Sequence, residues 1–440
     1  MLDVLADRTY RYLFASQIVA LLGTGLATVA LGLLAYSLAG ADAGTVLGTA
    51  LAIKMIAYVG IAPIAAAVTQ RLPRRATLIT LDLIRASVAV LLPFVTEIWQ
   101  IYVLIFMLQS ASACYTPVFQ AAIPDVLPNE KQYTRALSLS RLAYDLESVA
   151  SPLIAAALLT VVSFNSLFIG TIVGFIGAAL LVFSVTLPRP QNAAHGGFFD
   201  RMTKGVRIYL KTPRLRGMLA LGLAPAAAGS MVLVNTVVLV QANFGLGQQE
   251  TALALAAFGG GSMIAALALP RLLDHLPDRT VMLVGTTILT IACGLGSLLP
   301  NYQALLALWL VIGIGFAMST TPAGRLIRRS SNSGDRTALF AAQFALSHAA
   351  WLFCYPLAGW LGVTLGLNTT FLILGLIAAF GFALGMRLWR APDTEEIEHT
   401  HANLPAHHLH LASAARTEDG YRHKHTFVID ADHLLWPSRS

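Results

Sequence analysis

Two short stretches, "QRLPRRATL" (Gln70–Leu78) and "DHLPDRTVM" (Asp274–Met282), share a Leu-Pro pair and lie 204 residues apart in a chain of 440 residues. Two pairs of prolines repeat this spacing: Pro152 and Pro356 are 204 residues apart, and Pro117 and Pro322 are 205 apart. One coincidence would mean little. Three landmarks at nearly one offset indicate that a large unit of the chain has been duplicated.

The duplicated unit is strongly apolar. Charged residues make up 12% of the chain and mean hydropathy is +0.69, whereas a soluble domain carries roughly 25% charged residues. Apolar runs of about 20 residues are long enough to cross a hydrocarbon core of about 30 Å as helices. We expect twelve such spans, at residues 14–38, 46–69, 76–95, 99–123, 136–160, 165–187, 216–242, 251–270, 280–299, 302–323, 336–362 and 367–389. The predicted fold is therefore an all-α polytopic membrane protein, with twelve transmembrane helices in two pseudo-symmetric six-helix halves.

Four regions follow from these spans. We expect an N-terminal half at residues 1–187, a cytoplasmic linker at 188–215, a C-terminal half at 216–389 and a histidine-rich cytoplasmic tail at 390–440. The linker stretch "FFDRMTKGVRIYLKTPRLR" places apolar side chains among basic ones. That pattern predicts an amphipathic helix on the inner membrane surface.

The positive charges indicate the orientation of the chain. Of 29 Lys and Arg residues, only Lys54, Arg85 and Arg141 lie well inside spans, and the other 26 lie in the N-terminus, the even-numbered loops, the tail or the span ends that border them. By the positive-inside rule both termini are cytoplasmic, in a multi-pass protein of a bacterial-type inner membrane. The pI of about 9.4 thus reflects topology, and we expect no nucleic-acid partner.

The sequence does not favour an enzyme. It contains no phosphate-binding loop of the form G-x-x-x-x-G-K-[ST], no H-E-x-x-H and no G-x-S-x-G. The three cysteines, Cys114, Cys293 and Cys354, lie in three different apolar runs. We expect them to be small core residues, not a disulfide framework or a thiolate cluster.

The loop between the second and third spans resembles a motif of the major facilitator superfamily. That motif reads G-x-x-x-D-R-x-G-R-R, and "AAVTQRLPRR" is similar to it, with Gln70 in place of the acid. The second copy keeps an acid as Asp274. In this family the loop is thought to latch the two halves in alternate states. The resemblance, with the nearby span charges, implies a conformational latch formed by Gln70, Arg71, Arg74, Arg75, Asp82, Arg85, Asp274, Asp278 and Arg279.

Span five resembles the antiporter motif of the same family, G-x-x-x-G-P-x-x-G-G. "SVASPLIAAAL" keeps Pro152, and Ser151 replaces a glycine, so close helix packing at Ser151, Pro152 and the equivalent Pro356 is expected. The stretches "AIPDVLPNEKQYTRALSLSRLAYDLESVASP" and "ALFAAQFALSHAAWLFCYPLAGW" resemble the drug, siderophore and nickel exporter branch. The resemblance implies export by alternating access, without a required cofactor, by a monomer.

Charges inside spans cost roughly 2.5–3.5 kcal/mol each on insertion scales, so each needs a reason. Lys54 is either a snorkelling cation or the partner of a carboxylate in a cavity. Asp82 and Arg85, three residues apart, can pair on one helix face. They are expected near the cytoplasmic end of their span, supporting the preceding loop.

Span five holds the candidates for proton coupling. Arg141 and Asp145 are four apart and can pair, while Glu147 is rotated by about 200° from Asp145. A carboxylate in partly dry surroundings can exchange protons near neutral pH, so either acid is a candidate for coupling export to proton entry. A purely structural network is the alternative. His348 in span eleven either titrates or donates a helix–helix hydrogen bond.

The tail holds eight of the eleven histidines. Three H-x-H pairs (399/401, 408/410 and 423/425) let two rings reach one ion from an extended chain, and imidazole suits divalent nickel, cobalt, copper or zinc. A solvated, disordered tail is the alternative, as is a short segment docked on the cytoplasmic face. The candidate metal ligands are His399, His401, His407, His408, His410, His423, His425 and His433.

These patterns predict a secondary active transporter, coupled to protons and working as an exporter. Its substrate is expected to be a transition-metal ion of the nickel or cobalt type, or else a multidrug-type or siderophore-like small molecule. A membrane metal sensor, in which the tail is active and the spans inert, is a further alternative. The charges within the spans argue against that alternative.

Overall fold

The computed structural model describes residues 2–39, 43–69, 72–188, 197–390, 396–401, 409–411, 414–417, 420–430, 433 and 436–437. Most of these residues are helical. The helices of the first half are α1 (Arg8–Ala39), α2 (Ala43–Thr69), α3 (Arg74–Leu91), α4 (Ile98–Val126), α5 (Glu130–Leu158) and α6 (Leu167–Phe183). Helix α7 (Phe198–Lys211) follows, and then α8 (Pro213–Leu221), α9 (Leu223–Val237), α10 (Gln248–His275), α11 (Asp278–Gly296), α12 (Tyr302–Thr320), α13 (Ala323–Arg329), α14 (Arg336–Thr364) and α15 (Leu367–Leu388).

The described residues contain 11 helical stretches that are long and apolar enough to cross a membrane. In two of them the helix is interrupted but continues in the same direction: α8 and α9 are joined at Gly222, and α12 and α13 at Pro322. Helix α5 completes the expected set of twelve. It has the length of a span, with 29 residues, and it carries the predicted charges of span five, which lower its hydropathy.

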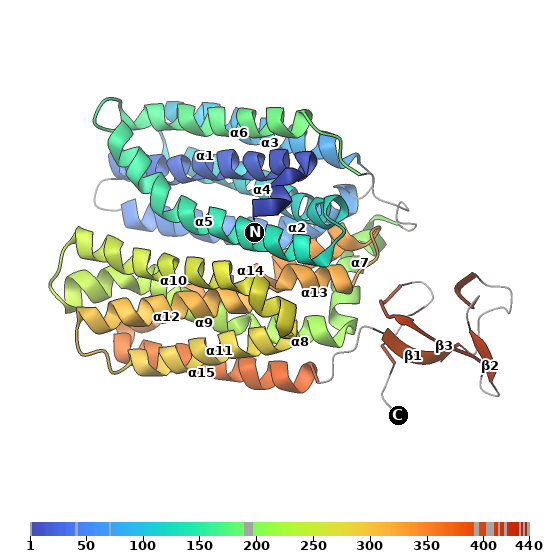
Figure 1. Ribbon diagram of the computed structural model, residues 1–440. Helices are drawn as coiled ribbons and strands as arrows, with labels where there is room; N and C mark the ends of the chain where they lie inside the picture. The colour runs from blue at the N-terminus through green and yellow to red at the C-terminus, as the bar shows by residue number, and fades with distance from the viewer. Residues whose placement is uncertain are drawn as a thin grey trace.

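The two halves have equivalent packing. In Figure 1 the first half (blue to green) lies above the second (yellow to orange), with their helices running roughly in the same direction. The main packing between the halves is α5 against α10 and α2 against α14. In the order of the expected spans, α5 and α10 are the fifth and eighth, and α2 and α14 are the second and eleventh. The second and eighth spans occupy equivalent positions in the two halves, as do the fifth and eleventh, so the two contacts are equivalent under the repeat. The predicted all-α membrane fold with two pseudo-symmetric halves is confirmed.

Small residues set the closest approaches between helices. A Cβ added at Gly261 of α10 would lie 1.9 Å from the backbone oxygen of Leu310, and one at Gly313 of α12 would lie 2.0 Å from that of Phe258. In a membrane such residues let two helix backbones pack directly. The pair α10–α12 therefore depends on glycine at these two positions.

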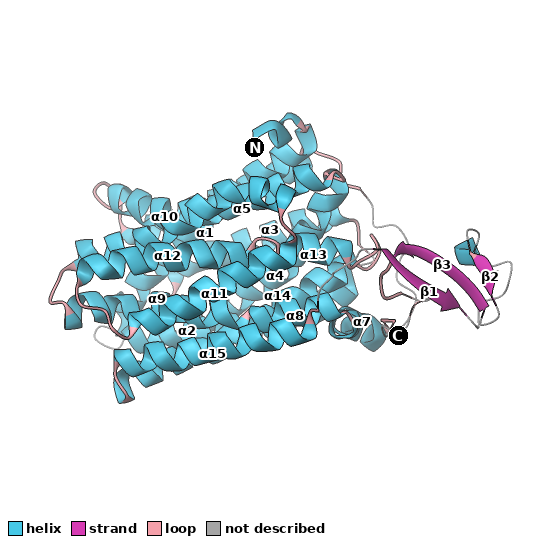
Figure 2. Ribbon diagram, turned by 60° about the horizontal axis from the view of Figure 1, so that its bottom comes forward, coloured by secondary structure: helices cyan, strands magenta, loops and turns pink. Residues whose placement is uncertain are grey.

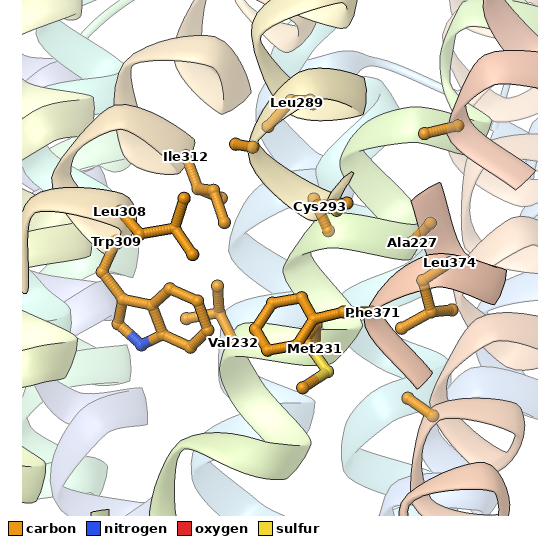
Figure 3. Close-up of a cluster of buried hydrophobic side chains, with 14 of the residues drawn as sticks. Ala227, Met231, Val232, Leu289, Cys293, Leu308, Trp309, Ile312, Phe371 and Leu374 are labelled. Carbon is orange, nitrogen blue, oxygen red and sulfur yellow. The ribbon is translucent and has the colours of Figure 1, made fainter. Parts of the chain in front are cut away.

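The core of the second half is shown in Figure 3. Trp309 and Phe371 are fully buried there with ring centroids 6.0 Å apart, and the indole Nε1–H of Trp309 donates to Thr236 Oγ1 at 2.9 Å. A buried indole N–H needs such a partner. Cys293 and Cys354 lie in the same cluster, as small core residues.

Helix α7 occupies the linker, where an amphipathic helix was expected. Its buried face packs on α2 and α14, and so on both halves. Arg201 donates from Nε to the carbonyl of Ala67 at 3.2 Å, and Lys204 pairs with Asp335 at 2.5 Å. Phe198 and Phe199, at the start of the helix, remain exposed. The linker thus bridges the two halves at one end of the bundle.

The tail forms a small antiparallel sheet, which the sequence did not predict. Strands β1 (Glu396–His401), β2 (Ala415–Thr417) and β3 (Gly420–Thr426) are ordered β1-β3-β2. Figure 2 shows the sheet beyond one end of the helices, next to α7 and α8. We call this end of the bundle the tail end. The disordered alternative does not describe these segments, because the strands pair and Phe427 and Ile429 pack on the bundle.

The glycine pair in α10 provides a test of this packing. Gly261→Ala places a methyl group against the Leu310 carbonyl and should lower the free energy of unfolding by about 1–3 kcal/mol through overpacking. The neighbouring variant Gly260→Ala is a matched control, since a Cβ there meets nothing within 4 Å. Thermal unfolding in detergent compares the two. Equal stability of both variants would contradict the α10–α12 packing.

Candidate functional site

A cavity of about 500 Å³ lies between the two halves. Its walls mix aromatic, amide, hydroxyl and cationic groups from both halves. Residues from the first half include Gln17, Thr24, Tyr58, Arg85, Tyr115, Arg141 and Tyr144, and those from the second include Gln343, Phe344, Ser347 and His348. A polar and aromatic cavity at the interface of two repeats is where a secondary transporter binds its substrate.

Arg85 belongs to this cavity. As predicted, it forms an ion pair with Asp82 on the same face of α3. Its guanidinium also lies between two rings, 4.1 Å from the centroid of Tyr115 and 4.6 Å from that of Phe175. These contacts offset the cost of removing the charge from water. From the sequence, the pair was expected to support the loop before α3, but the structure places Arg85 on the cavity wall.

Arg141 connects the two halves within the bundle. Its Nε and Nη2 donate to the Asp145 carboxylate at 3.1 and 2.6 Å, which is the pairing expected from their spacing in α5. The same Nε donates to Ser262 Oγ of α10 at 2.8 Å, and the guanidinium lies 4.8 Å from the ring centroid of Phe316. One ion pair on α5 therefore reaches two helices of the other half.

Lys54 of α2 and Glu147 of α5 lie close enough for their opposite charges to interact. The ammonium of Lys54 also lies 5.6 Å from the ring centroid of Tyr58. The Tyr58 ring packs edge-on against His348 at 4.8 Å, which brings α14 of the other half into contact. This arrangement fits the carboxylate-partner interpretation of Lys54.

Glu147 and Ser151 lie against α1. A Cβ added at Gly25 would be 2.5 Å from Glu147 Oε1 and 2.0 Å from Ser151 Oγ. Glu147 also lines an apolar crevice of about 310 Å³ between α1 and α5. The predicted packing motif thus makes a close contact through Ser151. Pro152 lies within α5, with its side chain outside the described residues, and Pro356 is an exposed residue of α14.

His348 is a partly exposed residue of the cavity wall. Its Nδ1–H donates to the backbone carbonyl of Phe344 at 2.7 Å. That bond assigns the proton to Nδ1 and leaves Nε2 as an acceptor. The residue therefore makes a hydrogen bond within its own helix.

Arg74 and Asp278, which are latch residues at equivalent positions of the two halves, form equivalent ion pairs. Arg74 pairs with Asp125, and Asp278 pairs with Arg329 at 2.7 Å. The two partners are 51 residues apart in both cases. Adding the repeat offset of 204 converts Arg74 into Asp278 and Asp125 into Arg329, so the second pair is the first with its charges exchanged. Gln70 and Arg71 lie outside the described residues.

These two pairs are joined across the halves at the tail end. Arg336 of the second half pairs with Asp125, and Arg325 pairs with Glu130 of the first half and with Asp278 at 2.9 Å. Arg329 also reaches Glu130 at 3.3 Å. The structure therefore represents a state in which the halves are held together at this end.

Three latch candidates have other roles in this state. Arg75 donates to the carbonyl of Phe183 and lies over its ring. Arg279 donates from Nε to the carbonyl of Trp389 at 2.7 Å, which ties the start of α11 to the end of α15. Asp274 is exposed. Sequence reasoning missed Asp125, although the repeat offset applied to charged residues would have indicated it.

The tail histidines converge on one face of the sheet. His399 lies opposite His423 in the β1–β3 register, and the H-x-H spacing puts His401 and His425 on the same face as these. His410 and His433 complete the group, with Nε2–Nε2 distances of 3.0 and 3.1 Å from His433 to His399 and to His410. Burial, with neighbouring imidazoles, lowers the pKa of both His399 and His423 to about 4. His407 and His408 lie outside the described residues.

Membrane-spanning helices in two equivalent halves, a polar cavity between them and ion pairs that join the halves at one end define a membrane transporter. The chain matches the Major Facilitator Superfamily over residues 13–233 and 219–422, and it belongs to that family. It is a multi-pass membrane transporter and not an enzyme.

The chain is similar to two groups of known proteins. It is 24% identical over 218 residues to macrolide efflux protein A of Streptococcus pyogenes, a match that covers 48% of this chain and 53% of the relative. The chain thus spans about half the length of the curated relatives it matches. Among solved structures it resembles the human organic anion transporter MFSD10 (TM-score 0.75, 13% identity, 86% of this chain and 99% of that chain). A bacterial homologue of the iron transporter ferroportin in its outward-facing state has a TM-score of 0.73 at 13% identity, over 86% and 99% of the two chains.

The cross-half pair Arg336–Asp125 provides a test of the closed tail end. Arg336→Gln removes the cross-half charge and leaves Arg74 to pair with Asp125 inside the first half. It should shift the population towards a state open at the tail end by about 1–3 kcal/mol, or roughly 5- to 150-fold. Electron-spin distance measurements between labels at Lys131 and Ser333 report the opening. Arg207→Gln, which breaks an exposed ion pair of α7, is the control, and identical distance distributions in all three proteins would contradict this assignment.

Proposed function

We propose that this transporter exports an organic small molecule in exchange for protons. The observation that carries this proposal is the composition of the cavity between the halves. Its described lining residues include no aspartate, glutamate or cysteine, and His348 is the one imidazole among them. A bare transition-metal ion needs several such ligands, whereas an organic molecule is held by aromatic surfaces with a few polar groups.

The direction of transport rests on orientation. Lys and Arg residues gather in the loops and the tail at the tail end, which favours a cytoplasmic location for that end in a bacterial inner membrane. In that orientation the ion pairs between the halves close the cavity towards the cytoplasm. Export then requires these pairs to open for loading from the cytoplasm. The macrolide efflux relatives support this direction.

The Arg141–Asp145 pair supplies a route for proton coupling. A proton on the carboxylate removes the charge that holds the guanidinium, and the same guanidinium contacts Ser262 and Phe316 of the other half. Protonation of Asp145 therefore changes a contact between the halves. Glu147 is the second candidate, since its protonation would remove the negative charge that lies near the ammonium of Lys54.

A transition-metal ion of the nickel or cobalt type is the second candidate cargo, and the histidine cluster of the tail favours it. Everted membrane vesicles energised with a proton gradient distinguish the two. They should accumulate a macrolide or a cationic dye from a panel that also contains Ni²⁺, Co²⁺ and Zn²⁺. Uptake of a metal ion alone would favour the metal cargo. No uptake of any of these compounds would argue for the metal-sensor alternative.

Asp145→Asn tests the coupling. It keeps the shape of the side chain and removes the charge, so proton-driven accumulation should fall at least tenfold, because each 1.4 kcal/mol of lost coupling is a factor of ten. Vesicle transport is measured with and without a proton gradient. Glu147→Gln, measured in parallel, shows which acid dominates.

Asp200→Asn is the matched control, because it removes the charge of an exposed ion pair in α7 and such pairs contribute little. Full gradient-driven accumulation in both Asp145→Asn and Glu147→Gln would refute proton coupling through α5.

A further inference from the structure

The tail sheet contains a dense group of imidazoles outside the membrane. One nitrogen from each of His399, His410, His423, His425 and His433 lies within 4.8 Å of the others. His401 joins them, with its Nε2 3.0 Å from that of His399. His423 and His433 are more than nine-tenths buried. The transport cavity does not include any of these residues.

Hydrogen bonds assign the protons of three of these rings. Nδ1 of His399 faces the Ile397 carbonyl at 3.1 Å, and Nδ1 of His425 faces the Thr426 carbonyl at 2.8 Å. Nδ1 of His433 faces Asp430 Oδ1 at 2.8 Å. Carbonyl and carboxylate oxygens accept, so each Nδ1 carries the proton and each Nε2 of a neutral ring presents a lone pair.

The unprotonated Nε2 atoms of His399 and His433 therefore face each other in the middle of the group. His399 Nε2 and His433 Nε2 are 3.0 Å apart, a distance at which one must donate or a cation must bind both. The Nε2 atoms of His423 and His425 are buried without a hydrogen-bond partner among the described residues. Buried polar atoms are rarely left so. A cation bound by these nitrogens would satisfy them.

The spacing fits a metal ion. Imidazole nitrogens bind such ions at about 2.0–2.1 Å, so two ligands at right angles are about 3.0 Å apart. The Nε2–Nε2 distances of 3.0, 3.0 and 3.1 Å match this value. Asp430 supplies the carboxylate that commonly orients a metal-binding histidine. We propose that the tail sheet binds one divalent transition-metal ion, of the nickel or cobalt type, through imidazoles of His399, His401, His410, His423, His425 and His433.

The site is attached to the transporter. Asp430 accepts a hydrogen bond from Asn332, between α13 and α14, at 3.4 Å. The Phe427 carbonyl accepts from Arg214 Nη2 of α8 at 3.3 Å, and the Arg214 guanidinium lies 5.1 Å from the ring centroid of Trp436. Asn332 lies three residues after Arg329, which takes part in the ion pairs between the halves. The proposed ion site is nevertheless separate from the cavity, so the proposal does not depend on which molecule the cavity carries.

Titration of the full-length protein in detergent with Ni²⁺ and Co²⁺, against a competing chelator, tests the site. One ion per chain is expected, and the double variant His399→Gln/His433→Gln should bind it at least 100-fold more weakly. Bound Co²⁺ should show the weak visible bands of six-coordinate geometry. His275→Gln, an exposed histidine of α10, is the matched control and should bind as the wild type does.

Asp430→Asn keeps all six imidazoles and removes only the carboxylate that orients His433. It should weaken binding 10- to 100-fold, whereas Glu398→Gln, an exposed carboxylate next to His399, should leave it unchanged. Hydrogen exchange of residues 396–426 shows whether the double variant keeps its sheet. If the double variant loses its sheet, the metal affinity of Asp430→Asn is the test of the site. Equal metal affinity in the wild type, the double variant and Asp430→Asn would overturn the proposal.

Discussion

A charge inside a membrane protein must be neutralised locally, and this constraint organises the interior of the bundle. Asp82 with Arg85 and Arg141 with Asp145 are paired within single helices, and aromatic rings cover both guanidinium groups. Isolated, each of these groups would destabilise insertion. Paired, they can line or border the cavity between the halves. The same pairing makes the helices sensitive to protonation, because one proton removes one partner.

The second set of ion pairs lies at the tail end and has a different role. Arg74–Asp125 and Asp278–Arg329 repeat one contact with opposite polarity, and Arg336 and Arg325 join these pairs across the halves. Because the charges are reversed, Arg329 occupies the position in the second half that Asp125 occupies in the first, and it also reaches Glu130 of the first half. Electrostatic attraction therefore acts between the halves as well as within them. A state closed at this end is stabilised by contacts that must break when the cavity opens there.

In the tail, the H-x-H spacing forms a histidine cluster only because the strands that carry it pair with each other. H-x-H puts two rings on one face of any extended segment, which the sequence analysis recognised. The spacing alone did not predict that two such segments, far apart in the chain, would pair so that His399 faces His423. Nor did any local pattern connect Asp430 with His433 or Phe427 with the bundle. The strands contain histidine, glutamate and lysine, which have little intrinsic preference for sheet.

The sequence by itself determined the membrane class, the twelve spans, the two halves and the pairs Asp82–Arg85 and Arg141–Asp145. Each of these depends on hydropathy over about 20 residues, on a repeat offset, or on helical spacing of three or four residues. Only the tertiary structure decided that Arg85 faces the cavity, that Arg141 reaches Ser262, and that Asp125 meets Arg336. The last two contacts join residues 121 and 211 positions apart. No local period encodes such contacts, because they form where the two halves pack against each other.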